Sequence, residues 1–148
     1  MIMASIEVNS DVPPTQAVAG AWIYAETENI LYPEDTKRSG KWLVFLQEES
    51  IDRCWMYMRV ALAMYRFGRK IKSSTCVSCG ERKRYVVCVY TYDYADSEDV
   101  MRIRASLRDL GIQYPITYKS NEQTRQGVYS EGVHGQKNSI SFTPIYKI

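Results

Sequence analysis

The strongest constraint on the fold is a long apolar segment followed directly by an amphipathic helix. Residues 84–94 (RYVVCVYTYDY) are rich in β-branched and aromatic side chains, which predicts a strand. Ser97 is expected to cap the next helix, and Gly111 to end it. Between them, apolar residues recur at helical spacing: Val100, Ile103, Leu107 and Leu110.

A second strand and helix precede this pair. Residues 41–47 (KWLVFLQ) form a continuous apolar run, which predicts a strand buried on both faces. Gly68 is expected to close the following helix as its C-cap. The stripe that this helix would bury against the sheet consists of Ile51, Trp55, Met58, Leu62 and Tyr65.

Shorter segments at 21–27, 69–76, 114–119 and 140–146 are predicted as further strands. The two helices lie between groups of strands without strict βαβ alternation. The sequence therefore predicts an α+β fold: a mostly antiparallel sheet with two main helices packed on one face.

The 148 residues are enough for one domain, and we expect a single α+β domain at 20–148. Residues 1–19 hold few apolar groups and are expected to form a flexible N-terminal arm. The chain has no signal-peptide pattern at its start and no apolar run of membrane-spanning length, so we expect a cytoplasmic protein without a membrane partner. The oligomeric state is left open.

Charge clustering bears on the choice of ligand, because nineteen basic and seventeen acidic residues give a net charge of only +2. Lys70 and Lys72 alternate along one predicted strand and therefore share a sheet face. Together with cations after the next strands they predict a phosphate pocket. The alternative is that they are solvated strand ends. The candidate ligand-binding residues are Lys72, Lys119 and Arg125, with Tyr118 and Trp42 as lesser candidates.

Alternating tyrosines at 90, 92 and 94 are typical both of a base-stacking platform and of a strand packed under a helix, and core burial is the favoured interpretation. The acidic residues Asp93, Asp96 and Asp99 are interpreted as turn and helix-cap residues.

Cys76 and Cys79 have the CxxC spacing of a zinc knuckle. A complete site needs four ligands, and Cys54 and Cys88 are predicted in the core. Completion would thus require His134 or a second protomer. A reduced pair in an exposed turn, with no cofactor, is the alternative.

Several ordered segments resemble one uncharacterised family. They are GKWLVFLQ (40–47), IKSST (71–75), VVCVYTYDYADSEDVMRIRASLRDLGI (86–112) and YKSNEQTRQGVYS (118–130). Over about residues 20–130 the chain resembles the basophilic-leukaemia-expressed protein family, some of whose members carry the label phosphothreonine lyase. The resemblance implies a curved sheet similar to that of translation initiation factor 4E, whose concave face binds the mRNA cap.

The chain departs from the cap-binding pattern that this resemblance implies. Cap binding uses two loop aromatics and a carboxylate, whereas Trp42 and Trp55 lie inside a predicted strand and helix. The leading hypothesis is therefore a binding domain for a phosphate-bearing ligand, a nucleotide or RNA end, on the concave face. A phospholyase with Lys72 or Lys119 as base, and a protein-interaction module with a large exposed apolar patch, are the alternatives.

Overall fold

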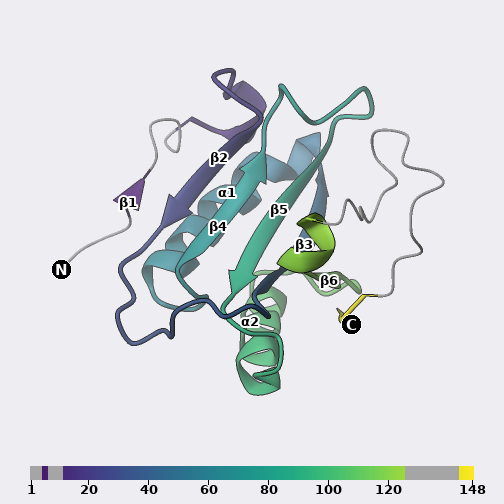
Figure 1. Ribbon diagram of the computed structural model, residues 1–148. Coiled ribbons are helices and arrows are strands. Elements are labelled where there is room, and N and C mark those ends of the chain that lie inside the picture. The colour runs from purple at the N-terminus through teal and green to yellow at the C-terminus, as the bar shows by residue number, and fades with distance from the viewer. Residues whose placement is uncertain (1–4, 7–11, 126–143) are drawn as a thin grey trace.

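The computed structural model describes residues 5–6, 12–125 and 144–148, and its centre is a curved antiparallel sheet (Figure 1). Within these residues the strand order is β1-β2-β4-β5-β3-β6-β7. The strands are β1 (Ser5–Ile6), β2 (Trp22–Glu26), β3 (Gly40–Gln47), β4 (Lys70–Ser74), β5 (Arg84–Thr91), β6 (Thr117–Ser120) and β7 (Tyr146–Lys147).

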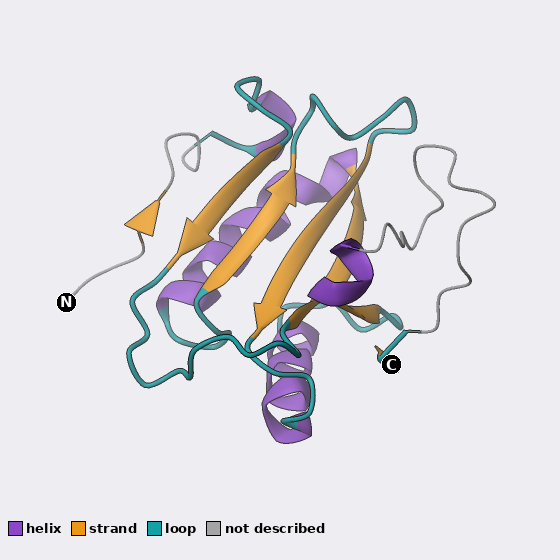
Figure 2. Ribbon diagram, viewed as in Figure 1, coloured by secondary structure: helices purple, strands orange, loops and turns teal. Residues whose placement is uncertain are grey.

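The two main helices cover one face of the sheet. Helices α1 (Glu48–Ala63) and α2 (Ser97–Asp109) lie behind it in Figure 2, whereas the short α3 (Asn121–Arg125) lies in front, beside β3 and β6. This arrangement confirms the predicted α+β class. Among the described helices, none has the length and apolar character needed to cross a membrane.

Alternation along each strand separates a core face from an open face. On β3, Trp42 and Val44 are fully buried toward the helices, and Trp42 Nε1 donates a hydrogen bond to Val100 O of α2 at 3.1 Å. Tyr118 of β6 is also fully buried, and its hydroxyl is 2.6 Å from Thr91 Oγ1. The expectation that residues 41–47 are buried on both faces is confirmed for residues 41–44 and is wrong for residues 45–47, which are partly or fully exposed.

The ends of α1 differ from the prediction. The helix starts at Glu48 and stops at Ala63, and the backbone reverses at Tyr65, which has a φ of 62°. Gly68 is consequently not a C-cap. It packs against the ring of Tyr32, where an added Cβ would approach to 2.7 Å, so the requirement for glycine is steric.

The N-terminus of α2 is capped by Asp96 rather than by Ser97. Asp96 Oδ1 accepts a hydrogen bond from Asp99 N at 3.2 Å. Asp93 forms an ion pair with Arg38 at 2.6 Å in the turn before the helix. The interpretation of these acidic residues as turn and cap residues is confirmed.

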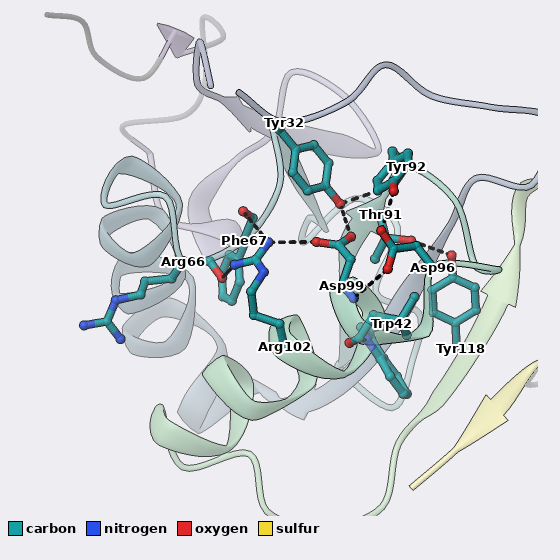
Figure 3. Close-up of polar contacts among 11 residues, drawn as sticks. Tyr32, Trp42, Arg66, Phe67, Thr91, Tyr92, Asp96, Asp99, Arg102 and Tyr118 are labelled. Carbon is teal, nitrogen blue, oxygen red and sulfur yellow. Dashed lines mark hydrogen bonds and ion pairs between the residues drawn. The ribbon is translucent and has the colours of Figure 1, made fainter. Parts of the chain in front are cut away.

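Asp99 also connects α2 to the β2–β3 loop through a hydrogen bond (Figure 3). Tyr32 of this loop donates to Asp99 Oδ2 at 2.6 Å, and Arg102 donates to Asp99 Oδ1 at 2.9 Å. Tyr92 N donates to the Tyr32 hydroxyl at 3.2 Å, which ties the same loop to the end of β5. The loop at the lower edge of the sheet is therefore held in one position.

Part of the expected N-terminal arm contacts α1. The 3₁₀ helix η1 (Pro14–Gln16) places Thr15 against Asp52, which accepts hydrogen bonds from Thr15 N at 3.1 Å and Oγ1 at 2.5 Å. Cys76 N donates to Pro14 O at 3.0 Å. Residues 12–16 are thus tied to the helix and to the β4–β5 loop, and the domain boundary at residue 20 stays a prediction.

Replacing Arg104, a fully buried residue of α2, should destabilise the fold. Its guanidinium donates to the carbonyl oxygens of Ile112, Tyr114 and Ile148, each at 2.9 Å. Arg104→Met removes these three hydrogen bonds, although Ile148 O keeps the one from Ile116 N, and should lower the free energy of unfolding by about 2–4 kcal/mol, measured by urea denaturation. Arg108→Met on the same helix is the matched control. Equal stabilities of the two variants would contradict this assignment.

Candidate functional site

The open face, the side of the sheet away from α1 and α2, carries cationic and aromatic side chains. Strand register sets them next to one another: Lys41 pairs with Tyr90 on one side and with Lys119 on the other. Lys72 pairs with Cys88, which in turn pairs with Leu43. The alternation predicted for Lys70 and Lys72 is confirmed, since both lie on this face beside Tyr24 and Tyr90.

A cavity of about 810 Å³ occupies the open face. Three lysines from three strands line it: Lys41, Lys72 and Lys119. Its apolar lining includes Leu43, Phe45 and Val86, and the Arg84 guanidinium carbon lies 4.6 Å from the centre of the Phe45 ring. Trp22 and the β4–β5 loop, with Arg82, complete the lining. Cavities of this volume accept ligands of nucleotide size.

Lys41 is only 6% exposed. Its side chain is enclosed by α3, where Nζ donates to Asn121 Oδ1 at 2.8 Å and to Thr124 Oγ1 at 2.7 Å. Burial above all, together with the positive charges of Lys119, Lys72 and Lys70, lowers the pKa of Lys41 to about 8. A neutral amide and a hydroxyl hold this ammonium without neutralising it.

Lys72 lies over the indole of Trp22. Its Nζ is 3.9 Å from the centre of the Trp22 ring, a cation–π contact, and 6.0 Å from that of Tyr24. Burial lowers the pKa of Lys72 and also that of Lys119. None of the ion pairs between described residues involves Lys41 or Lys72.

Cys88 lies beneath the lysines. Burial raises the pKa of its thiol, although the charges of Lys72, Lys41 and Lys119 oppose this shift. A neutral thiol offers the lysines no compensating charge. Within the described lining of the cavity, Glu81 in the β4–β5 loop is the acidic residue, so this surface is strongly positive.

The structure brings together two of the predicted ligand-binding residues, Lys72 and Lys119. Arg125 lies on α3 with a side chain that is 65% exposed and ion-paired with Glu122, outside the cavity lining. Trp42 and Tyr118 face the helices and are fully buried. The expectation that these two aromatics contact a ligand on the concave face is corrected, because each is adjacent in sequence to a lysine that points the other way.

Sequence reasoning missed Lys41 and Trp22 and misplaced Tyr90. The core interpretation of the tyrosines is wrong for Tyr90, whose ring lies on the open face between two lysines, 4.4 Å from Lys70 Nζ and 5.7 Å from Lys41 Nζ. Tyr92 and Tyr94, beyond the end of β5, pack partly against the core. The period-two alternation within β3 could have identified Lys41, because it places Lys41 on the face opposite Trp42, the same face as its β6 partner Lys119.

The cysteine pair lies in the β4–β5 loop, and both thiols are free. Cys76 Sγ donates to Ala17 O at 3.1 Å, and Cys79 is 9% exposed. The described residues contain no group of three or more histidine, cysteine or acidic side chains arranged to hold a metal. His134, the expected further ligand, lies outside the described residues, so zinc binding stays a prediction.

An exposed apolar stripe runs along α1, on the side opposite the sheet, and continues for two residues past the end of the helix at Ala63. Its members are about half exposed, at 48–59% of their surface: Met56, Tyr57, Val60, Met64 and Tyr65. Exposed apolar side chains in such a row are a feature of protein-binding surfaces.

Comparison with known families agrees with this architecture. The family model described as "Basophilic leukemia-expressed protein Bles03" matches residues 16–125. The chain belongs to the Bles03 family. The resemblance predicted from the sequence is therefore confirmed.

Solved structures similar to this Bles03 family member are eIF4E proteins. Schistosome eIF4E, complexed with m7GpppA and 4E-BP, has a TM-score of 0.64 and 16% identity, covering 93% of this chain and 75% of that one. C. elegans eIF4E-3, in a complex with Mextli and a cap analog, has a TM-score of 0.63 and 14% identity over the same shares. Ascaris suum eIF4E-3, with an m2,2,7G cap, has a TM-score of 0.57 and 19% identity, covering 90% and 74%. The predicted similarity of fold to initiation factor 4E is confirmed.

The buried charge of Lys41 should make stability depend on pH. Lys41 titrates at about 8 in the folded protein and near its ordinary value of 10.5 when unfolded, so between these values unfolding takes up a proton and stability rises with pH. The electrostatic penalty is fully present below the folded pKa and is relieved above it. Relative to Lys41→Met, the wild type should gain about 1–2 kcal/mol between about pH 7 and pH 9.5, measured by urea denaturation.

The exposed residue Lys37 provides the control for this titration. Relative to Lys37→Met, the wild type should show no comparable gain over the same pH range. A stability difference between the wild type and Lys41→Met that does not change with pH would show that Lys41 titrates as an exposed lysine.

Proposed function

We propose that the open face binds a phosphate-bearing ligand, a nucleotide or an RNA end, and that the protein acts as a binding domain. The observation that carries this proposal is that Lys41, Lys72 and Lys119, from three different strands, line one cavity of about 810 Å³ together with Arg82 and Arg84. Lys72 and Lys119 were expected from the sequence, and the structure adds Lys41.

Burial disfavours the charged forms of Lys41 and Lys72, and neighbouring lysine charges lower the pKa of each of them further toward the neutral form. A phosphate supplies two negative charges and several acceptor oxygens to the same space. The charge that is unfavourable in the empty cavity thereby becomes the source of affinity. Proteins commonly retain such unfavourable charges at binding sites.

Aromatic residues of the open face support an organic group with a flat ring. Trp22, Tyr24 and Phe45 surround or border the cavity, and base stacking on such rings tolerates any sequence. The solved eIF4E structures contain cap nucleotides, which makes a nucleotide on this fold a natural candidate. Fold similarity at such low identity adds support without specifying the ligand.

A phospholyase is the second candidate, favoured by the lowered pKa of Lys41. In that reaction a lysine would take the α-proton of a phosphothreonine, and the bond between the β-carbon and the phosphate oxygen would break. Phosphate would leave with the bonding electrons, and a dehydrated residue would remain in the peptide. A base that titrates at about 8 is partly neutral near physiological pH, which such a step requires.

A protein partner is a further candidate, supported by the apolar stripe of α1 from Met56 to Tyr65. Two of the solved eIF4E structures include 4E-BP, and one includes the 4E-binding protein Mextli. This surface lies on the opposite side of the sheet from the lysines. A protein partner there is compatible with ligand binding on the open face.

Charge reversal should abolish ligand binding. A nucleotide at about one hundred times its dissociation constant should raise the melting temperature of the wild type by about 5 °C or more, since it binds the native state alone. The double variant Lys72→Glu/Lys119→Glu should lose this shift. Arg53→Glu on α1, behind the sheet, is the control and should retain it.

Three results of a thermal-shift screen with nucleotides, cap analogues and phosphopeptides would separate the candidates. A nucleotide shift that the double variant retains would overturn the placement of the site. Stabilisation by phosphopeptides with release of phosphate would favour the lyase. No shift with any phosphate compound would overturn the proposed function.

A further inference from the structure

We infer that the open face binds a single strand of nucleic acid over several nucleotides, from the lysines of β3, β4 and β6 to Arg82 and Arg84 at the start of β5. This inference rests on the proposed function and names the class of the ligand and its path across the sheet. The strand contributes more than one phosphate, and its bases stack on rings that lie between two groups of cations.

The first group of cations crosses four neighbouring strands. Lys41 of β3 pairs with Lys119 of β6 on one side and with Tyr90 of β5 on the other. Lys70 of β4 contacts the same tyrosine, with its Nζ 4.4 Å from the ring centre, and Lys72 lies two residues further along β4 on the same face. The charges of the other three lysines each lower the pKa of Lys41, which shows that their ammonium groups lie near it.

The second group of cations lies at the other end of β5. Arg84 is the first residue of this strand and Arg82 precedes it in the β4–β5 loop, and both line the cavity. Tyr90 follows Arg84 by six positions, so the two share a face and are about 20 Å apart along the strand. Figure 1 shows the β4–β5 loop at one end of β5 and the arrowhead of the strand at the other. The open face therefore carries cations at both ends.

Aromatic rings accompany these cations. Lys72 Nζ is 3.9 Å from the centre of the Trp22 ring, and the guanidinium carbon of Arg84 is 4.6 Å from that of Phe45. Both rings are partly exposed and line the cavity, and Phe45 pairs with Val86, two residues after Arg84 on β5. Bases of a single strand stack on exposed aromatic rings and on guanidinium planes, beside cations that hold the backbone. The open face combines all three.

The separation of the two groups of cations requires several nucleotides. A stacked strand advances about 3.4 Å per nucleotide, and bases that stack on protein rings instead of on one another are further apart. A distance of about 20 Å therefore corresponds to about three to six nucleotides. A single nucleotide cannot reach both groups, whereas a strand of this length places an internal phosphodiester at each.

The charge of the cavity also suits a ligand with several phosphates. The charged residues of its described lining are five cations and one carboxylate: Lys41, Lys72, Arg82, Arg84, Lys119 and Glu81. A terminal phosphate carries about two negative charges, which is less than this excess of cations. A single strand brings one negative charge with every nucleotide and distributes them along the same path.

The experiment titrates the full-length protein, by calorimetry, with uridine 5′-monophosphate and with oligouridylates of two, four, six and ten nucleotides that have hydroxyl groups at both ends. The hexamer should bind about tenfold or more tighter than the dimer, because it reaches both groups of cations. The decamer should gain no more than about twofold over the hexamer. A hexamer of the same backbone without bases should bind about tenfold more weakly than the hexamer, and a deoxyuridine hexamer is included to identify RNA or DNA as the strand.

Variants test the far end of the path. Arg84→Gln should weaken the hexamer about fivefold or more, reduce the gain from dimer to hexamer, and lower the slope of log affinity against log salt concentration by about 0.7, since one phosphate contact is lost. Lys83→Gln is the matched control, because Lys83 is exposed and carries the same charge but does not line the described cavity. It should weaken the hexamer less than about twofold. Phe45→Leu should weaken the hexamer more than the hexamer without bases.

The outcomes distinguish failure of this inference from failure of the proposed function. Equal affinity for the dimer and the hexamer, or equal losses in Arg84→Gln and Lys83→Gln, would overturn the inference, and binding of uridine 5′-monophosphate would then leave the proposed function standing. Equal affinity for the hexamers with and without bases would show that phosphates alone are bound and would also overturn it. Absence of binding by the monophosphate and by every oligomer would remove the proposed function itself. Tighter binding of the ribose hexamer than of the deoxyribose hexamer would support the inference and identify RNA as the strand.

Discussion

The pairing of β3 with β5 is the interaction on which the rest of the structure depends. Eight consecutive residue pairs, from Gly40 with Thr91 to Gln47 with Arg84, determine which side chains at the centre of the sheet face the helices and which face the open side. With this register, Trp42 and Val44 pack in the core under α1 and α2. A slip by one residue would bury Lys41 beneath the helices, so core packing and the composition of the open face are set together.

The same pairing explains why a lysine cluster can exist so close to the core. Lys41 and Lys119 are each about 5–6% exposed, yet their side chains open toward the cavity and away from the helices. Their backbone positions are held by β3 and β6. Buried charges that lower stability and do not improve packing are typical of functional sites.

The sequence was sufficient for the class of fold and for part of the site. Period-two and helical patterns predicted the strands and both helices, and the placement of Lys70 and Lys72 on one face followed from their spacing alone. The interpretation of residues 41–47 as buried on both faces was right for residues 41–44, but a continuous apolar run does not show which of its residues face the helices. Phe45 and Leu43 look like core residues in sequence, but they form the floor of a cavity.

Trp42 and Tyr118 were misassigned for a related reason. An aromatic residue next to a lysine suggests a joint binding role, but neighbours on a strand point to opposite faces, so Tyr118 and Lys119 cannot both reach one ligand. Trp22 was missed because its importance comes from Lys72, a residue far along the chain that the β2–β4 register brings beside it. Cation–π pairing between strands depends on register, which a single sequence does not specify.

One face of the sheet packs against the helices and the other lines the cavity, and this separation explains how one fold can bind different ligands. The core face holds its helices through buried apolar groups and through fixed contacts such as those of Arg104 and Trp42. Substitutions on the open face leave these contacts in place, so the cavity can change its charge and aromatic content without loss of the fold. In this chain the cavity is lined by lysines from three strands and by aromatic rings that two of its cations contact, Lys72 at Trp22 and Arg84 at Phe45.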